Sequence, residues 1–348
     1  MRFGLLGAGC IGQLRAQALA QLPGATLGAV ADVNPAAAAR LAAPAGARVV
    51  PGLEQLLALG EIDAVIVSTP PQFHEPAVLA ALAAGKHVLC EKPLASSLEA
   101  SRRMVQAART HGKILTTGFN HRYFPAIQFL KKTLAAGTIG QLNHVRAFAG
   151  HEGLSQFRSA AEHDPKVIGG GALLDVGIHL IDLTAYILGD VREVYGVATG
   201  TVWNLPGAED NGFALLRSSA GAVATLHASW TEWKGYRFYL EAYGDRGMVR
   251  AYYAPMTHLL ICMDQPGGVR RRSRSFYPLN IIREKLFGWQ GTVVETFRQE
   301  LADFSALAAG GNPPTIADGF AGFRAIEIAH AIYRSTAEGK AIGLTRSF

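Results

Sequence analysis

A glycine-rich turn near the N-terminus restricts the fold of this chain more than any other feature. Gly7-Ala8-Gly9-Cys10-Ile11-Gly12 follows a short apolar segment, residues 2–6, and precedes an Ala- and Leu-rich segment, residues 13–22. In such a strand–turn–helix unit the first glycine allows the turn, the second lets a pyrophosphate approach the backbone, and the third lets the helix pack against the strand. The start of the helix favours phosphate charge. We therefore predict that residues 7–12 contact a dinucleotide.

A second apolar segment, residues 25–31, ends at Asp32, which lies 20 residues after Gly12. An acid at this distance can accept hydrogen bonds from the adenosine ribose. Its negative charge would repel a 2′-phosphate, so the sequence favours NAD over NADP. Arg40 lies downstream and could compensate, which leaves NADP as an alternative.

Strand-like and helical segments alternate up to residue 120. Residues 64–67 form a β-branched run that is typical of a buried parallel strand, and residues 87–90 form another strand. Ligands bind at the carboxyl ends of such strands. We predict an α/β dinucleotide-binding domain over residues 1–120. Lys92, just after the second of these strands, could stabilise charge on a reacting oxygen; an ordinary surface lysine is the alternative.

Beyond residue 120 short strand-like segments joined by turns dominate. They are residues 143–148, 191–202, 212–217, 222–230, 236–243, 248–253 and 259–263. Helical patterns cover residues 126–134, 172–188, 293–309 and 319–338. We predict a second, α+β domain over residues 121–348, with a large, mostly antiparallel open sheet and a helix on one face. Residues 268–286 show no clear pattern and are expected to form a loop.

Asp175 and His179 follow three glycines, residues 169–171, in an apolar helical segment. Because they are four residues apart, a helix places both on one face. A carboxylate beside an imidazole can orient the ring and stabilise its protonated form. The glycines could leave room for another group to approach the backbone. The alternative is an exposed Asp–His pair with no function.

Three separated motifs resemble the glucose–fructose oxidoreductase, inositol dehydrogenase and rhizopine-catabolism (Gfo/Idh/MocA) family. They are STPPQFHEPAVLAALAAGKHVLCEKPLA from Ser68, GFNHRYFPA from Gly118 and GGGALLDVGIHLIDL from Gly169. They occur in the family's order, and the resemblance covers nearly the whole chain. It implies an N-terminal Rossmann domain that binds NAD or NADP.

The resemblance also implies the reacting residues. Carried over by motif, the catalytic set is Lys92, Asp175 and His179. A cis peptide bond before Pro93 is expected, as are closing helices that return towards the cofactor domain. The open face of the sheet is expected to pack against another subunit, in a homodimer or homotetramer.

Further candidates lie in these motifs and elsewhere in the chain. The predicted cofactor contacts outside the glycine turn are Asp32, Ser68, Thr69, Pro70, His74, Glu91, Lys92 and Asn120. The predicted substrate contacts are Lys92, Asn120, Arg122, Tyr123, Asp175 and His179. His121 and His163 are weaker candidates, and Trp203, Trp230, Trp233 and Trp289 could stack on a sugar, although packing is the commoner role of tryptophan.

Charge and composition narrow the class of protein. The net charge is +6, and much of the excess lies in Arg270, Arg271, Arg272 and Arg274, without any nucleic-acid-binding module. This cluster could meet an acidic group, but a solvated loop is the commoner role. No apolar run reaches the about 18 residues of a membrane span. The three cysteines, Cys10, Cys90 and Cys262, are widely spaced and form no metal pattern, which favours the cytoplasm.

The sequence thus predicts an NAD(P)-dependent oxidoreductase that transfers a hydride between nicotinamide and a secondary alcohol or ketone of a sugar, polyol or sugar derivative. His179 is expected to take the hydroxyl proton, Lys92 to stabilise the developing alkoxide, and Asp175 to orient His179 or the substrate. One alternative is an NAD-dependent glycoside-cleaving enzyme that oxidises its substrate transiently. Another is a non-catalytic dinucleotide-binding regulator, although such relatives tend to lose the catalytic residues.

Overall fold

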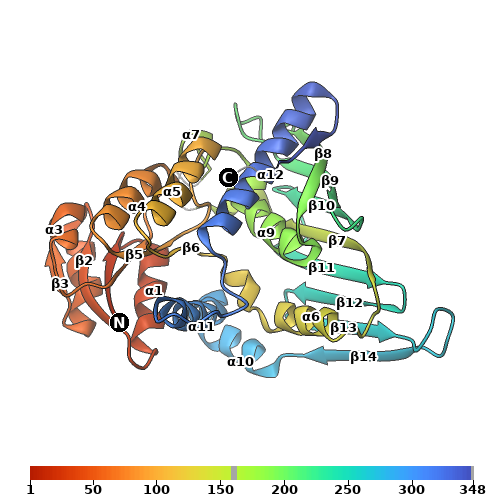
Figure 1. Cartoon of the computed structure of the whole chain (residues 1–348), viewed down its shortest axis with the longest axis horizontal. Helices are drawn as coiled ribbons and strands as arrows, with labels where there is room; N and C mark the ends of the chain where they lie inside the picture. Colours follow the sequence, from red (N-terminus) through yellow and green to blue (C-terminus); the bar gives the residue numbers. More distant parts are fainter. Residues whose placement is uncertain (158–162, 346–348) are drawn as a thin grey trace. The chain divides into compact units, whose positions relative to one another are not determined.

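The computed structural model describes residues 1–157 and 163–345, which form two compact units (Figure 1). The first unit contains Met1–Tyr123 and Arg283–Phe323. The second contains Phe124–Ile282 and the chain from Arg324 onward. The first unit therefore includes a late segment of the chain, next to the segment that carries the glycine turn.

A six-stranded parallel sheet forms the centre of the first unit, in the order β3-β2-β1-β4-β5-β6. Its strands are β1 (Arg2–Leu6), β2 (Thr26–Ala31), β3 (Arg48–Val50), β4 (Ala64–Val67), β5 (His87–Cys90) and β6 (Leu115–Thr117). Every residue of β4 is fully buried, as expected of a parallel strand covered on both faces. This confirms the predicted Rossmann domain.

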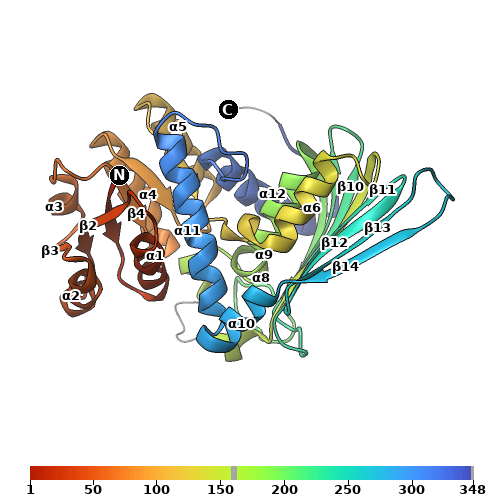
Figure 2. The same cartoon turned by 90° about the horizontal axis from the view of Figure 1, so that it is seen from below.

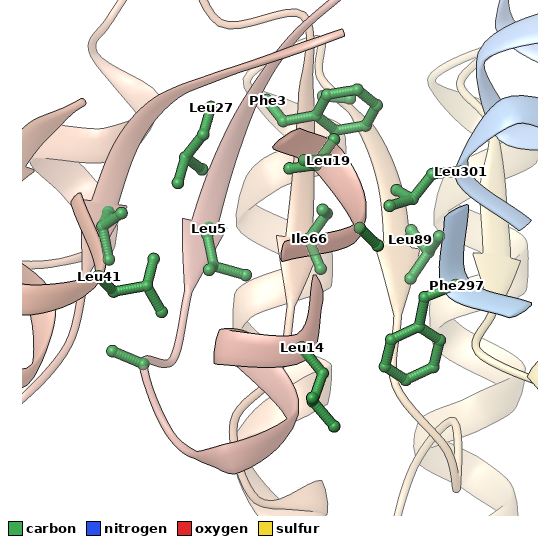
Figure 3. Packing of buried hydrophobic residues seen from close by; sticks show 14 of the residues in the cluster. Phe3, Leu5, Leu14, Leu19, Leu27, Leu41, Ile66, Leu89, Phe297 and Leu301 are labelled. Carbon is green, nitrogen blue, oxygen red and sulfur yellow. The ribbon is translucent and has the colours of Figure 1, made fainter. Parts of the chain in front are cut away.

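Helices cover this sheet. They are α1 (Cys10–Ala20), α2 (Pro35–Ala42), α3 (Leu53–Leu57), α4 (His74–Ala83), α5 (Leu98–Thr110) and, from the late segment, α11 (Trp289–Ala308). Figure 3 shows Phe297 and Leu301 of α11 in the same buried cluster as Leu14 of α1 and Leu89 of β5. The core of the first unit is therefore completed by residues near the end of the chain.

A nine-stranded sheet forms the second unit, in the order β14-β13-β12-β11-β7-β10-β9-β8-β15. Its strands are β7 (Leu142–Gly150), β8 (Val191–Thr199), β9 (Asn211–Ser218), β10 (Val223–Ser229), β11 (Arg237–Gly244), β12 (Gly247–Tyr253), β13 (Thr257–Cys262), β14 (Arg271–Phe276) and β15 (Ile342–Gly343). β7 and β10 pair in parallel, and the other pairs are antiparallel. The predicted large, mostly antiparallel sheet is confirmed.

One face of this sheet is covered by α6 (Pro125–Ala135) and α9 (Gly177–Leu188), as Figure 2 shows. α9 packs on β7 and β10, and α6 on β12 and β13. Strand β9 alternates buried and exposed residues, and its exposed side chains include Phe213 and Leu215. The opposite face of the sheet thus presents apolar side chains.

Two of the predicted secondary-structure segments differ from the structure. The segment expected as a loop, residues 268–286, forms β14 and most of α10 (Pro278–Phe287). β14 shows no buried alternation because nearly all its side chains are exposed, so its sequence carried no strand signal. The helix predicted over residues 172–188 is broken at Val176 into α8 (Ala172–Asp175) and α9.

The remaining helix α12 (Gly319–Glu338) begins in the first unit and ends in the second, and α7 (Pro165–Ile168) is short. Single turns of 3₁₀ helix are η1 (Ala43–Ala45), η2 (Pro71–Phe73), η3 (Asn120–Tyr123) and η4 (Gly153–Gln156). Within residues 1–157 and 163–345, no helix is long and apolar enough to span a membrane.

Candidate active site

The glycine turn leads into α1, and its three glycines have different surroundings. Gly7 has a φ of +100°, and a Cβ there would lie 2.6 Å from the Ser68 carbonyl oxygen. A Cβ on Gly12 would collide with the Gly7 carbonyl oxygen. By contrast, a Cβ on Gly9 would meet no atom within 4 Å, and Gly9 is exposed. Internal packing requires the first and third glycines, whereas the second leaves open access to the start of α1.

The Asp32 carboxylate is fixed at the end of β2. Its Oδ2 accepts a hydrogen bond from the Ala8 backbone N–H at 2.6 Å, and its Oδ1 accepts one from the Asn34 N–H at 2.7 Å. A carboxylate has about four acceptor positions, so these two bonds leave capacity for ribose hydroxyls. Arg40, the alternative determinant of cofactor choice, is exposed in the last turn of α2.

Ser68 and Thr69 follow β4. Within the described chain, the buried oxygens Ser68 Oγ and Thr69 Oγ1 have no hydrogen-bond partner. A buried polar group left unpaired costs about 1–3 kcal/mol, so a ligand that bonds these hydroxyls would stabilise the site. With the open approach at Gly9 and the fixed Asp32 carboxylate, these residues fit a bound dinucleotide. Pro70, another predicted contact, is exposed.

His74 has a different place from the one predicted. Its side chain is fully buried at the start of α4. Nε2 lies 2.8 Å from the Thr69 carbonyl oxygen, and Nδ1 lies 3.0 Å from that of Pro93 and 3.3 Å from that of Leu94. The His74 ring therefore has no accessible surface for the predicted direct contact with the cofactor, and both nitrogens face backbone carbonyls.

Glu91 belongs to a buried charged cluster that sequence analysis missed. Arg15 of α1 forms ion pairs with Glu91 and with Glu300 of α11, each with a nitrogen–oxygen distance of 2.6 Å. The guanidinium also lies over the Phe297 ring, 3.6 Å from its centroid. Burial raises the pKa of Glu300 to about 7, against the opposing effect of the Arg15 charge. The cluster joins α1, α11 and the end of β5 immediately before Lys92.

Lys92 follows this cluster. The Lys92–Pro93 peptide bond is cis, which confirms the expectation. The Lys92 backbone N–H points to Glu91 Oε2 at 3.4 Å. His121 was a weak candidate in the sequence. Burial and the charge of Lys92 together lower the pKa of His121 to about 3. His121 is thus a neutral imidazole near the ammonium group at ordinary pH.

The predicted contacts Asn120, Arg122 and Tyr123 lie in η3 and bond to late segments of the first unit. Asn120 Nδ2 donates to Thr296 Oγ1 at 2.9 Å, and the Tyr123 hydroxyl donates to Asp303 Oδ2 at 2.9 Å. Arg122 Nη1 donates to the carbonyl oxygens of Thr315 and Ile316, both at 3.3 Å. Burial and the charges of Glu300 and Asp303 raise the pKa of Tyr123 above its usual value. These bonds hold η3 in place.

In the second unit, Gly170 and Gly171 are packed against the chain's own atoms. A Cβ on Gly170 would collide with the Tyr333 hydroxyl, and one on Gly171 would collide with the Glu209 backbone. The Glu209 carboxylate accepts hydrogen bonds from the N–H groups of Gly171 at 2.9 Å and Leu173 at 2.7 Å. These glycines therefore serve internal packing at the start of α8, rather than the approach of a ligand that the sequence suggested.

Asp175, at the end of α8, is held by two partners that sequence analysis missed. Its Oδ2 lies 3.0 Å from His151 Nε2 and accepts a hydrogen bond from Trp230 Nε1 at 3.0 Å. Because His151 Nδ1 accepts a bond from the Gly153 N–H, the hydrogen of a neutral His151 ring lies on Nε2 and is donated to Asp175. Burial, and to a smaller extent the Asp175 charge, raise the pKa of Tyr236 above its usual value, so its hydroxyl stays protonated. Asp175 is thus an anchored carboxylate among aromatic side chains.

His179 lies in the first turn of α9 and is nearly buried, with 8% of its surface exposed. Lys92 belongs to the first unit, and Asp175 and His179 to the second. That the three act on one substrate remains a prediction. No signal in the sequence indicated His151, the residue after β7, or Trp230 as a partner of Asp175.

The other candidates have ordinary surroundings. Trp233 and Trp289 are exposed, and the Trp203 indole donates to the Trp230 carbonyl oxygen at 3.0 Å. The exposed arginines of residues 270–274 lie on and beside the edge strand β14. His163 contacts the Phe157 ring. Cys10, Cys90 and Cys262 are free thiols.

Comparison with known proteins gives matches along the chain. Residues 1–119 match the family model described as "Oxidoreductase family, NAD-binding Rossmann fold", and residues 127–250 match the "GFO/IDH/MocA C-terminal domain". Inositol 2-dehydrogenase of Paracoccus denitrificans is 31% identical over 92% of this chain and 90% of its own. Myo-inositol 2-dehydrogenase of Thermotoga maritima is 28% identical over 99% and 98%.

A solved structure adds a bound cofactor to this comparison. The WlbA dehydrogenase from Bordetella pertussis, in complex with NADH and UDP-GlcNAcA, superposes with a TM-score of 0.82. It is 26% identical and covers 100% of this chain and 98% of its own. The similarity therefore extends over both units.

Proposed function

Since the chain belongs to the Gfo/Idh/MocA family and is an NAD-dependent oxidoreductase of sugars or polyols, we propose that it oxidises a secondary hydroxyl of its substrate. The proposed catalytic residues are Lys92, Asp175 and His179. Among substrates, a cyclic polyol of the inositol type is the first candidate, because the relatives named above act on inositol. NADP is retained as the second cofactor to test.

The observation that carries the proposal is the cofactor cradle of the first unit. The open approach at Gly9, the fixed Asp32 carboxylate and the buried hydroxyls of Ser68 and Thr69 offer the groups that a dinucleotide needs. When bound, NAD supplies the acceptor for the hydride. The protein's own residues then have to bind the alcohol and move its proton.

His179 accepts the proton of the substrate hydroxyl as general base. Lys92 donates a hydrogen bond to the same oxygen and stabilises the negative charge that develops there. Asp175 orients the base or the substrate, and the bonds from His151 and Trp230 hold its carboxylate in one position. A fixed carboxylate is preorganised, so little reorientation is needed during the reaction.

The test is a substrate screen that follows NADH absorbance with polyols, aldoses, sugar acids and glycosides. We expect stoichiometric NADH formation with at least one polyol or sugar, and loss of most activity in Lys92→Ala. Sugar release from a glycoside without net NADH would instead favour the glycoside-cleaving alternative. NAD binding without any turnover would favour the regulator.

We also propose that the exposed face of the nine-stranded sheet joins two copies of the chain, within a dimer or tetramer. The exposed apolar side chains Tyr195, Val197, Phe213 and Leu215 lie on neighbouring strands β8 and β9. Light scattering should give a molecular mass of at least twice that of the monomer. The Phe213→Glu substitution should reduce this measured mass. The three free cysteines favour a cytoplasmic location of the enzyme. We also propose that the protein does not bind nucleic acid.

A further inference from the structure

Two loops of the first unit must keep a fixed relation if the proposed chemistry is to work. One follows β4 and carries Ser68 and Thr69, and the other follows β5 and carries Lys92. β4 and β5 are parallel neighbours, paired up to Val67 and Cys90. At the end of this ladder, the Glu91 N–H donates to the Val67 carbonyl oxygen at 2.9 Å. Beyond it, the sheet ladder no longer holds the loops together.

The His74 ring lies between the two loops and contacts both. Its Nε2 faces the Thr69 carbonyl oxygen at 2.8 Å, and its Nδ1 faces the Pro93 carbonyl oxygen at 3.0 Å. His74 is the first residue of α4, which packs on β4, β5 and α5. The ring is therefore anchored in the scaffold and reaches the backbone on each side of it.

The ring has one way to affect the reaction. It is fully buried, so it cannot touch cofactor or substrate, and its polar atoms face backbone carbonyls alone among the described contacts. Burial lowers the pKa of His74, while the carbonyl contacts and the charge of Glu91 act in the opposite direction. Any influence on turnover has to pass through the positions of the loops.

We propose that His74 is a positioning residue that holds the Thr69 and Lys92 loops in register, and so places the Lys92 ammonium at the reacting oxygen. This rests on the proposed role of Lys92. A displacement of about 1 Å in a catalytic group can cost about a hundredfold in rate. A neutral imidazole carries one N–H, so the ring donates to the carbonyl oxygen on one side and packs against the one on the other side. The contact at Pro93 is one residue away from Lys92, so its loss can displace Lys92.

The test compares His74→Phe, which keeps a ring but no nitrogen, with His74→Asn, which keeps one donor. We expect His74→Phe to lower kcat about 10- to 100-fold, with a smaller change in the KM for the alcohol, and His74→Asn to recover part of the loss. His87→Gln is the matched control. His87 lies at the start of β5 and accepts a hydrogen bond from the Ile114 N–H at 3.1 Å, away from both loops.

A double-mutant cycle separates positioning from a general loss of structure. If His74 acts through Lys92, adding His74→Phe to Lys92→Ala should change kcat less than twofold. Equal losses in both backgrounds, an unchanged kcat in folded His74→Phe, or an equal loss in His87→Gln would overturn the proposal. If Lys92→Ala alone keeps its activity, the proposed function of Lys92 fails, and that result is read from the single variant.

Discussion

Two runs of glycine precede helices in this chain, and they serve different purposes. At Gly9 in the first unit, a side chain would meet no atom within 4 Å, and the start of α1 stays accessible. At Gly170 and Gly171 in the second unit, the space is filled by Tyr333 and Glu209. Both stretches are rich in glycine, and in the first stretch only Gly9 is open, because Gly7 and Gly12 also pack against the chain's own atoms. The difference teaches that glycine before a helix marks a close approach, and only the fold tells whether a ligand or the protein itself makes it.

The polar groups at the two helix starts differ in the same way. At α1 the hydroxyls of Ser68 and Thr69 have no partner in the described chain, whereas at α8 the Glu209 carboxylate already accepts the backbone hydrogen bonds. The first start is arranged to bind, and the second is arranged to hold Asp175 and His179 in place. Predictions that separate binding from chemistry therefore test this comparison directly.

The largest effect should come from the second unit. His179→Ala should lower kcat for alcohol oxidation about 100-fold or more and leave NAD affinity unchanged. In the wild type, oxidation should rise with pH as a histidine loses its proton, because only the neutral ring accepts one. The His179→Ala variant should lack that limb of the pH–rate profile. If the variant kept the rise of the rate with pH, a group other than His179 would be the general base.

A substitution of Lys92 tests whether the first unit contributes a catalytic residue in addition to the cofactor site. Lys92→Ala should lower kcat about 100-fold or more, as expected for loss of a donor to a developing oxyanion. NAD affinity, measured by titration of the fluorescence of bound NADH, should stay close to that of the wild type. If turnover barely changes, the first unit supplies the cofactor site alone.

Two glycine-to-alanine substitutions, each of which adds one methyl group, test the comparison of the two glycine stretches. Gly171→Ala should lower the free energy of unfolding by about 1–3 kcal/mol, because its Cβ collides with the Glu209 backbone. Gly9→Ala should change stability by less than about 0.5 kcal/mol but weaken NAD binding. Denaturant unfolding and NAD titration of both variants measure the two effects. Equal destabilisation would remove the distinction.

Cofactor choice should depend on Asp32. Because its carboxylate is fixed beside the turn, wild-type enzyme should prefer NAD to NADP, and Asp32→Ser should narrow the preference. A change of tenfold corresponds to about 1.4 kcal/mol. Wild-type preference for NADP by that margin would contradict the assignment and point to Arg40.

The smallest effect concerns the buried Glu300. Its pKa in the folded protein is about 7, above the ordinary value of 4.5, because burial disfavours the charged form. The folded state therefore binds a proton more tightly than the unfolded state, and this stabilisation is lost as pH rises from about 4.5 through about 7. As pH rises from 5 to 8, the unfolding free energy of the wild type should fall relative to that of Glu300→Gln, because only the wild-type side chain titrates. A constant difference would show that Glu300 does not titrate there.

The sequence could predict local patterns and those that the resemblance carries. The strand–turn–helix at Gly7, the strand ends at Ser68 and Lys92 and the cis bond before Pro93 depend on neighbours in the chain. The pairing of Arg15 with Glu300 joins residues 285 positions apart. Nothing around an arginine in an apolar helix indicates so distant a partner. The same holds for His151 and Asp175, because the fold alone brings a strand end to a helix end.

The late arrival of α11 has a consequence for synthesis. The core of the first unit contains Phe297, Leu301 and Phe304, so its hydrophobic cluster is incomplete until these residues leave the ribosome. Residues 124–282, which belong to the second unit, are made before them. At about 5–20 residues per second, residues 1–123 wait on the order of ten seconds or more with an uncovered apolar surface on α1 and β5. We therefore expect chaperones to bind the ribosome-bound chain during that interval. A fragment that ends at residue 123 would keep this apolar surface exposed permanently.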